Sequence, residues 1–138
     1  MTPAAQDLAA RELERIAALR MQMLEMHPFW GYLLLQVQVV AAPQLHCIAA
    51  TDCVRHIWFN PTHTQHLSAR QLGFVLAHEV GHQVFATLPR ERGRNRHLWN
   101  CATDYAINRI VARMDHPGRP GQRLYEVPDG HLPELGEL

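Results

Sequence analysis

Residues 78–82 read HEVGH, and these residue types at this spacing can hold and use a metal ion. Positions i and i+4 of a helix lie on one face, so the imidazoles of His78 and His82 can reach the same ion. Glu79 lies about 100° further around the helix, where its carboxylate can reach a water bound to the metal. In a zinc hydrolase, imidazoles fix the ion, the ion acidifies a water, and a carboxylate takes the proton of that water. The same Glu79 can then pass the proton to a leaving amine.

The sequence around HEVGH favours a structured metal site over a chance match. Random placement of residues gives on the order of 0.04 matches to HExxH in a chain of this composition, so the pattern needs support from its context. Val80 and Gly81 between the two His carry no charge, as burial against a sheet requires. The alternative is a core helix whose two His are satisfied by hydrogen bonds alone.

A catalytic zinc site with two His ligands needs a third protein ligand. The metzincin pattern would require a His at position 88, which is Leu. Asp104 is better placed than the other candidates, because it lies inside a predicted helix with Asn100 and Asn108 one turn away on either side. Amides at these positions can support a metal-bound carboxylate, whereas the alternative is a solvated polar face. The other candidates for the third ligand are Glu91, His97, Asp115 and His116.

Two helices must carry these residues. A capping box at Ser68–Gln71 predicts a helix from residue 69 to about 86, which carries HEVGH. Asn95 is the predicted cap of a second helix, from about residue 96 to 114, which carries the candidate third ligand. The Arg-rich segment 90–96 is interpreted as a solvated loop rather than a phosphate site.

The rest of the chain predicts a scaffold for this pair of helices. A hydroxyl cap followed by Pro opens an amphipathic helix that ends near residues 27–28. The apolar, partly alternating runs 33–40 and 54–59 predict two strands that pair in a small antiparallel sheet. Residues 117–138 are rich in Pro and Gly and predict an irregular tail. With no internal repeat and no visible boundary, we expect one α+β domain over residues 1–138.

Composition excludes several classes of function. The chain has 138 residues, and its 13 cationic residues, all Arg, balance 13 acidic ones. This balance argues against binding to nucleic acid or to an anionic membrane, and the missing Lys rules out Lys-based catalysis. We see no signal peptide and no apolar run of about 18 residues, the length needed to span a membrane. Cys47, Cys53 and Cys101 lack CxxC spacing, which predicts free thiols in a cytoplasmic protein.

Taken together, HEVGH, Trp99-Asn100 and the DYAIN segment at 104–108 resemble a known family. It is the zinc metallopeptidase domain often fused to, or encoded beside, a von Willebrand factor A-like domain. The resemblance covers most of the chain and implies a minimal zincin-like fold with Asp104 as the third ligand. This chain departs from the family in having Cys53 where Gly is expected after Thr-Asp. It also ends without a von Willebrand factor A-like domain, so we expect such a partner to act in trans or to be absent.

The sequence therefore predicts a zinc-dependent hydrolase that cleaves peptide bonds through a metal-activated water. The edge of the small sheet would bind an extended peptide or protein substrate. The alternatives are a zinc-binding module with an interaction or regulatory role, and hydrolysis of a bond other than a peptide. The predicted site comprises one Zn²⁺ on His78, His82 and Asp104, Glu79 as general base and then acid, Asn100 and Asn108 around the ligands, and Tyr105, His97 or the loop arginines as oxyanion stabiliser.

Overall fold

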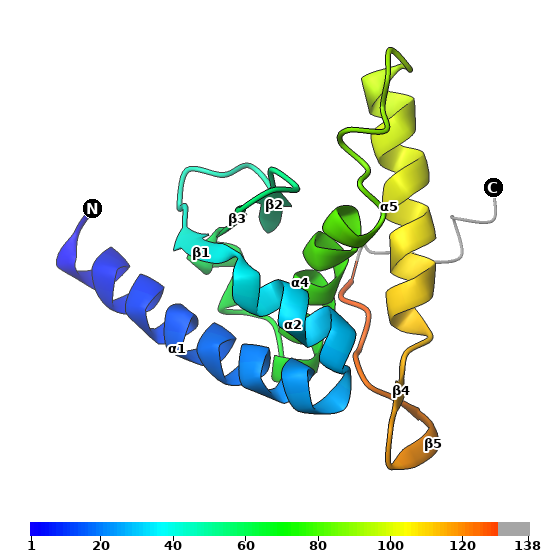
Figure 1. Ribbon diagram of the computed structural model, residues 1–138. Helices are drawn as coiled ribbons and strands as arrows, with labels where there is room; N and C mark the ends of the chain where they lie inside the picture. Colours follow the sequence, from blue (N-terminus) through cyan, green and yellow to red (C-terminus); the bar gives the residue numbers. More distant parts are fainter. Residues whose placement is uncertain (130–138) are drawn as a thin grey trace.

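The computed structural model describes residues 1–129 and shows a mixed α+β fold, which confirms the predicted fold class (Figure 1). Its larger sheet has three strands, and a separate two-stranded hairpin lies near the C-terminus. In chain order the elements are α1 (Pro3–Met26), α2 (Pro28–Gln36), β1 (Gln38–Ala41), β2 (Ala49–Thr51), β3 (His56–Phe59), α3 (Pro61–Thr64), α4 (Ala69–Val84), α5 (Arg96–Ala112), β4 (Asp115–His116) and β5 (Arg119–Arg123).

The segment after α1 corrects one prediction, because much of the expected strand 33–40 is helical. Pro28 takes the first position of α2, where its fixed φ suits a helix, and the helix continues to Gln36. Gly31 permits this packing: a Cβ there would lie 2.4 Å from the Cα of Leu24 in α1. A run of apolar residues fits a buried helix as well as a strand, so periodicity alone could not separate the two.

The three-stranded sheet is mixed rather than antiparallel, and its strand order is β1-β3-β2. β1 and β3, from the two runs predicted to pair, do pair, but in parallel, with Gln38 opposite His56. The antiparallel partner of β3 is β2, a strand that the sequence did not predict. A tight turn joins β2 to β3, in which the Asp52 carboxylate accepts hydrogen bonds from the N–H groups of residues 54–56. This turn makes β2 the neighbour of β3 on one side and leaves β1 the other side.

α4 is the central helix of the fold, and it contacts α1, α2, α5 and β2. Its capping box is present as predicted: the Ser68 hydroxyl accepts from the N–H of Gln71, and the Gln71 side chain accepts from the N–H of Ser68. Every residue from Leu72 to Gly81 is buried. HEVGH thus begins inside the core and ends where α4 reaches the surface.

The C-terminal segment is more ordered than predicted. β4 and β5 form a short antiparallel hairpin, so the expected irregular tail from residue 117 is wrong over residues 119–123. Beyond the hairpin, Leu124 and Tyr125 are buried against the core. The part of the predicted tail from residue 130 onward lies outside the described residues. None of the helices in residues 1–129 has the length and hydropathy to cross a membrane.

Candidate metal centre

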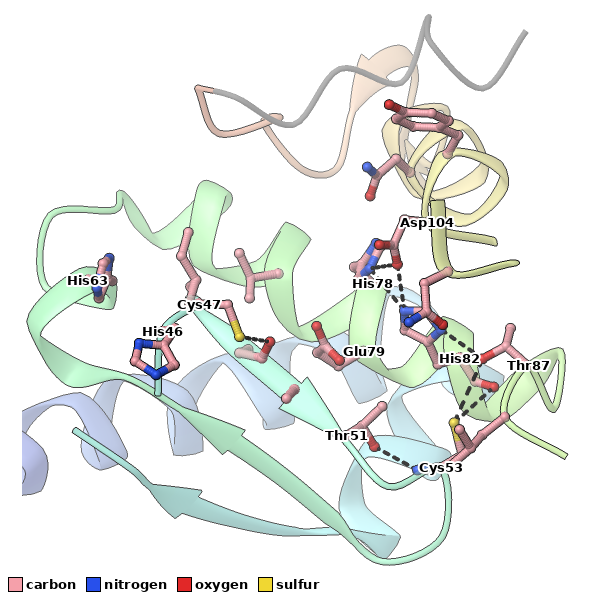
Figure 2. A pocket seen from close by; sticks show the side chains of 18 residues that line it. His46, Cys47, Thr51, Cys53, His63, His78, Glu79, His82, Thr87 and Asp104 are labelled. Carbon is pink, nitrogen blue, oxygen red and sulfur yellow. Dashed lines mark hydrogen bonds and ion pairs between the residues drawn. The ribbon is translucent and has the colours of Figure 1, made fainter. Parts of the chain in front are cut away.

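Three of the predicted site residues converge at the junction of α4 and α5. The ligand atoms of His78, His82 and Asp104 all lie within 4.8 Å of one another. Asp104 Oδ1 is 3.2 Å from Nε2 of His78 and 3.0 Å from Nε2 of His82, and the two Nε2 atoms are 3.1 Å apart. Figure 2 shows the three side chains pointing toward one another. Two imidazole nitrogens and one carboxylate oxygen suit zinc and leave a coordination position open.

Close packing of the two helices lets Asp104 reach α4. Gly81 faces Ile107 of α5, and a Cβ at this position would lie 2.5 Å from the Ile107 Cγ2 methyl. Trp30 of α2 packs against the same glycine, 3.5 Å from the position of that Cβ, and its indole N–H donates to the carbonyl oxygen of Ala77 at 2.8 Å. Residues of α2 and α5 therefore both pack closely against HEVGH.

The charges of the three candidate ligands support one another. Burial favours the neutral form of Asp104, but hydrogen bonds from His78 and His82 outweigh it and hold the pKa of this carboxyl well below its usual range. Burial also disfavours a charged His78, yet the hydrogen bond to Asp104 and the negative charges of Glu79 and Asp104 raise its pKa. A site that favours positive charge in this way suits a bound cation, and a metal would displace protons from it.

Glu79 is buried beside the two His, with 7% of its surface exposed. Burial raises the pKa of its carboxyl, and the opposing effect of His78 and His82 does not cancel this rise. Glu79 lines the same cavity as the candidate ligands (Figure 2) but lies outside their cluster. A carboxylate next to a metal and in contact with a cavity can exchange protons with a bound water.

The cavity has a volume of about 710 Å³ and runs along the sheet from the cluster of His78, His82 and Asp104, here called the His-His-Asp cluster. One wall is β2 with the residues just before it, and the other comes from α4 and α5. His46 and His63 line the end away from the His-His-Asp cluster (Figure 2). Their spacing along the chain carried no signal, because they lie in separate segments that only the fold brings together.

The predicted supporting residues are divided between the cavity and the surface. Asn100, Asn108 and Tyr105 line the cavity, whereas His97 is exposed and outside it, with Nε2 3.8 Å from the Cys101 sulfur. Asn108 is buried, and its side chain contributes to the raised pKa of His78. Among the described residues, Nδ1 of His78 and Oδ1 of Asn108 are buried atoms without a hydrogen-bond partner. They are a complementary donor and acceptor, as a metal-bound imidazole requires.

The other candidate third ligands have different partners. Glu91 pairs with Arg96, Asp115 pairs with Arg123, and His116 accepts from the N–H of Gly118. In the part of the chain that the structure describes, none of these three residues joins the His-His-Asp cluster.

The Arg-rich loop makes bonds to its own surroundings. Arg90 donates to the carbonyl of Phe85, and Arg94 donates to that of Arg90 while its guanidinium lies over the Trp99 ring. These contacts are consistent with a structural role for the loop.

Two residues at the site carried no signal in the sequence. The hydroxyl of Thr87 lies 2.8 Å from Nδ1 of His82, and the thiol of Cys53 lies 3.8 Å from that hydroxyl. Thr87 follows the end of α4 and Cys53 lies in the turn after β2, so helical spacing relates neither residue to His82.

Comparison with known proteins agrees with the geometry. A family model described as "Putative metallopeptidase domain" matches residues 11–128, a span that includes all of α4 and α5. No curated protein and no solved structure gives a significant match to the chain. With its His-His-Asp cluster within the matched span, the chain belongs to this metallopeptidase-domain family.

Proposed function

We propose that the protein is a zinc-dependent peptidase that uses His78, His82 and Asp104 as metal ligands and Glu79 as general base. The observation that supports this most is the convergence of three ligand atoms from two helices within 4.8 Å, next to a buried carboxylate in the same cavity. A purely structural zinc site has four protein ligands and no open position. Three ligands beside a large cavity suit catalysis better.

Zn²⁺ in this site would supply Lewis acidity and would lower the pKa of a water. Glu79 accepts a proton from the attacking water, and its raised pKa lets the carboxyl carry that proton and donate it to the leaving nitrogen. Asn108 orients the His78 ring through Nδ1, and Asn100 supports the site from the cavity wall. Tyr105 lines the cavity and is the better of the two predicted oxyanion stabilisers, because His97 lies outside it.

The shape of the cavity favours an extended peptide as substrate. β2 is an edge strand, since the order β1-β3-β2 gives it one strand neighbour in the described sheet. The same strand lines the cavity next to Glu79 and the ligands (Figure 2). An extended peptide can add to such an edge through main-chain hydrogen bonds and place one of its carbonyls at the metal.

Replacing Glu79 with Gln tests the catalytic part of the proposal. We expect Glu79→Gln to keep one equivalent of zinc and to lose cleavage of fluorescein-labelled casein and of a quenched-fluorescent peptide library. Glu14→Gln, at an exposed position of α1, is the matched control and should cleave like the wild type. Equal cleavage by Glu79→Gln and wild type would remove Glu79 as the base. Zinc binding without cleavage by any variant would favour the regulatory module instead.

Metal analysis tests the ligand set separately. Zinc measured by elemental analysis should fall in Asp104→Ala and stay at one equivalent in Asp115→Ala, whose carboxylate pairs with Arg123 outside the site. Unchanged zinc in Asp104→Ala would mean that the third ligand is another residue. A von Willebrand factor A-like partner in trans and a cytoplasmic location stay predictions.

A further inference from the structure

Thr87, three residues past the end of α4, folds back onto the second histidine of HEVGH. The N–H of Thr87 donates to the carbonyl of His82 at 3.0 Å, and the Thr87 hydroxyl lies 2.8 Å from Nδ1 of the same residue. The indole N–H of Trp99, on α5, donates to the carbonyl of Thr87 at 2.6 Å. Thr87 is buried, with 6% exposure, and is thus fixed to both metal-bearing helices.

Cys53 reaches the same two residues from the sheet side. Its sulfur lies 3.6 Å from the carbonyl oxygen of His82 and 3.8 Å from the hydroxyl of Thr87 (Figure 2). The backbone N–H of Cys53 donates to the Thr51 hydroxyl at 3.1 Å, which fixes the turn that carries the thiol. His82, Thr87 and Cys53 therefore contact one another in a closed set of three.

The three contacts suit a His82 that binds a metal. Nε2 of His82 faces His78 and Asp104, so it is the nitrogen that a metal would take, and Nδ1 would then carry the ring proton. The Thr87 oxygen, 2.8 Å away, can accept a hydrogen bond from Nδ1–H. The Thr87 O–H can then donate to the Cys53 sulfur, and the Cys53 S–H can donate to the carbonyl of His82.

We propose that Thr87, supported by Cys53, positions His82 for metal binding by accepting a hydrogen bond from Nδ1–H while Nε2 faces the metal. The inference rests on the proposed metal site. Residues that orient metal-bound histidines in this way typically change metal affinity by about 10- to 100-fold when replaced.

The test compares Thr87→Val, which keeps the shape and loses the hydroxyl, with Thr87→Ser, which keeps the hydroxyl. We expect the zinc Kd, measured by competition with a chromophoric chelator, to rise about 10- to 100-fold in Thr87→Val and to recover in Thr87→Ser. Thr64→Val is the matched control: Thr64 is also buried and donates to Glu12 at 2.7 Å, and it neither lines the cavity nor belongs to the His-His-Asp cluster. It should lower thermal stability and leave the zinc Kd unchanged.

Rescue by Ser separates this role from a merely structural one, because Thr87→Ser keeps the hydroxyl and loses only the methyl. Wild-type zinc affinity in Thr87→Val, or a zinc Kd in Thr87→Ser as weak as in Thr87→Val, would overturn the inference. A wild type that binds no zinc would refute the proposed function, whereas zinc binding that is insensitive to Thr87→Val would refute the role of Thr87 alone.

Discussion

Replacing Gly81 with Ala perturbs the close contact between α4 and α5, the two helices that carry the candidate ligands. The new Cβ would lie 2.5 Å from the Ile107 Cγ2 methyl, whereas carbon atoms in contact settle about 3.5–4.0 Å apart. The helices must therefore separate locally by roughly 1 Å. Asp104 precedes Ile107 by one turn on α5, so it should move away from α4 along with the methyl.

Two effects on the free energy of unfolding oppose each other in this variant. Overpacking a core contact costs about 1–3 kcal/mol, and Ala in place of Gly inside a helix returns about 1 kcal/mol. We expect a net loss of up to about 2 kcal/mol from these two terms. The effect on the metal should be larger than this loss suggests, because ligand distances tolerate only about 0.2 Å of error.

Gly73→Ala is the matched control, since it overpacks the same helix away from the metal. Its Cβ would lie 2.5 Å from the ring of Tyr125, so a similar loss of stability is expected. Urea unfolding of the metal-free proteins gives the stability, and zinc titration at a temperature where all are folded gives the affinity. Gly81→Ala should bind zinc at least 10-fold more weakly than Gly73→Ala. Equal zinc affinities in the two variants would refute the idea that this glycine contact sets the reach of Asp104.

Three further outcomes follow from the structure. Trp30→Phe removes the indole donor to the Ala77 carbonyl, which keeps its bond within α4, and should cost about 0.5–1.5 kcal/mol in urea unfolding; an unchanged free energy of unfolding would contradict this role. Burial raises the pKa of the Asp52 carboxyl, but hydrogen bonds from His56, Val54 and Arg55 outweigh it and lower the pKa. The stabilisation from Asp52 is thus fully present above about pH 4 and is lost as the pH falls through the lowered pKa of the folded state, so Asp52→Asn should be less stable at pH 7, by a margin that begins to shrink by pH 3. A pH-independent difference would refute this. Zinc at 100 times its Kd should stabilise the wild type by about 2.7 kcal/mol, and a chelator should reverse the shift; an unchanged melting temperature would argue against a zinc site.

The His-His-Asp cluster was predictable because helix geometry relates its residues. His78 and His82 are one turn apart on one helix, and Asp104 lies between two Asn at the same spacing on the next. Thr87 and Cys53 were not predictable, since their contacts depend on how a turn and a helix end fold in space. Cys53 illustrates this limit: the resemblance expected Gly there, and the residue has a φ of 61°, in the region that favours Gly.

The strand predictions were right for β3 and for the end of the first run, and wrong for residues 33–36, which belong to α2. Residues 33–36 are apolar apart from Gln36, so their pattern could not distinguish a helix buried against α1 from a strand. The orientation of β1 depends on β2, whose three small residues carry no alternating pattern. A turn held by one aspartate decides which strand becomes the neighbour of β3, and a hydrophobicity pattern does not register such a contact.

The position of α5 has a consequence for how a metal would act on the folded chain. Figure 1 shows α5 at the periphery, where its main helix contact is α4, and Leu98 near its start is 66% exposed. A metal bound to both helices would close a loop from His82 to Asp104, much as a disulfide closes one. Closing a loop of this size removes conformational entropy equivalent to about 3 kcal/mol from the unfolded chain. The ion would thus be a cross-link as well as a cofactor, and the outermost helix would gain most from it.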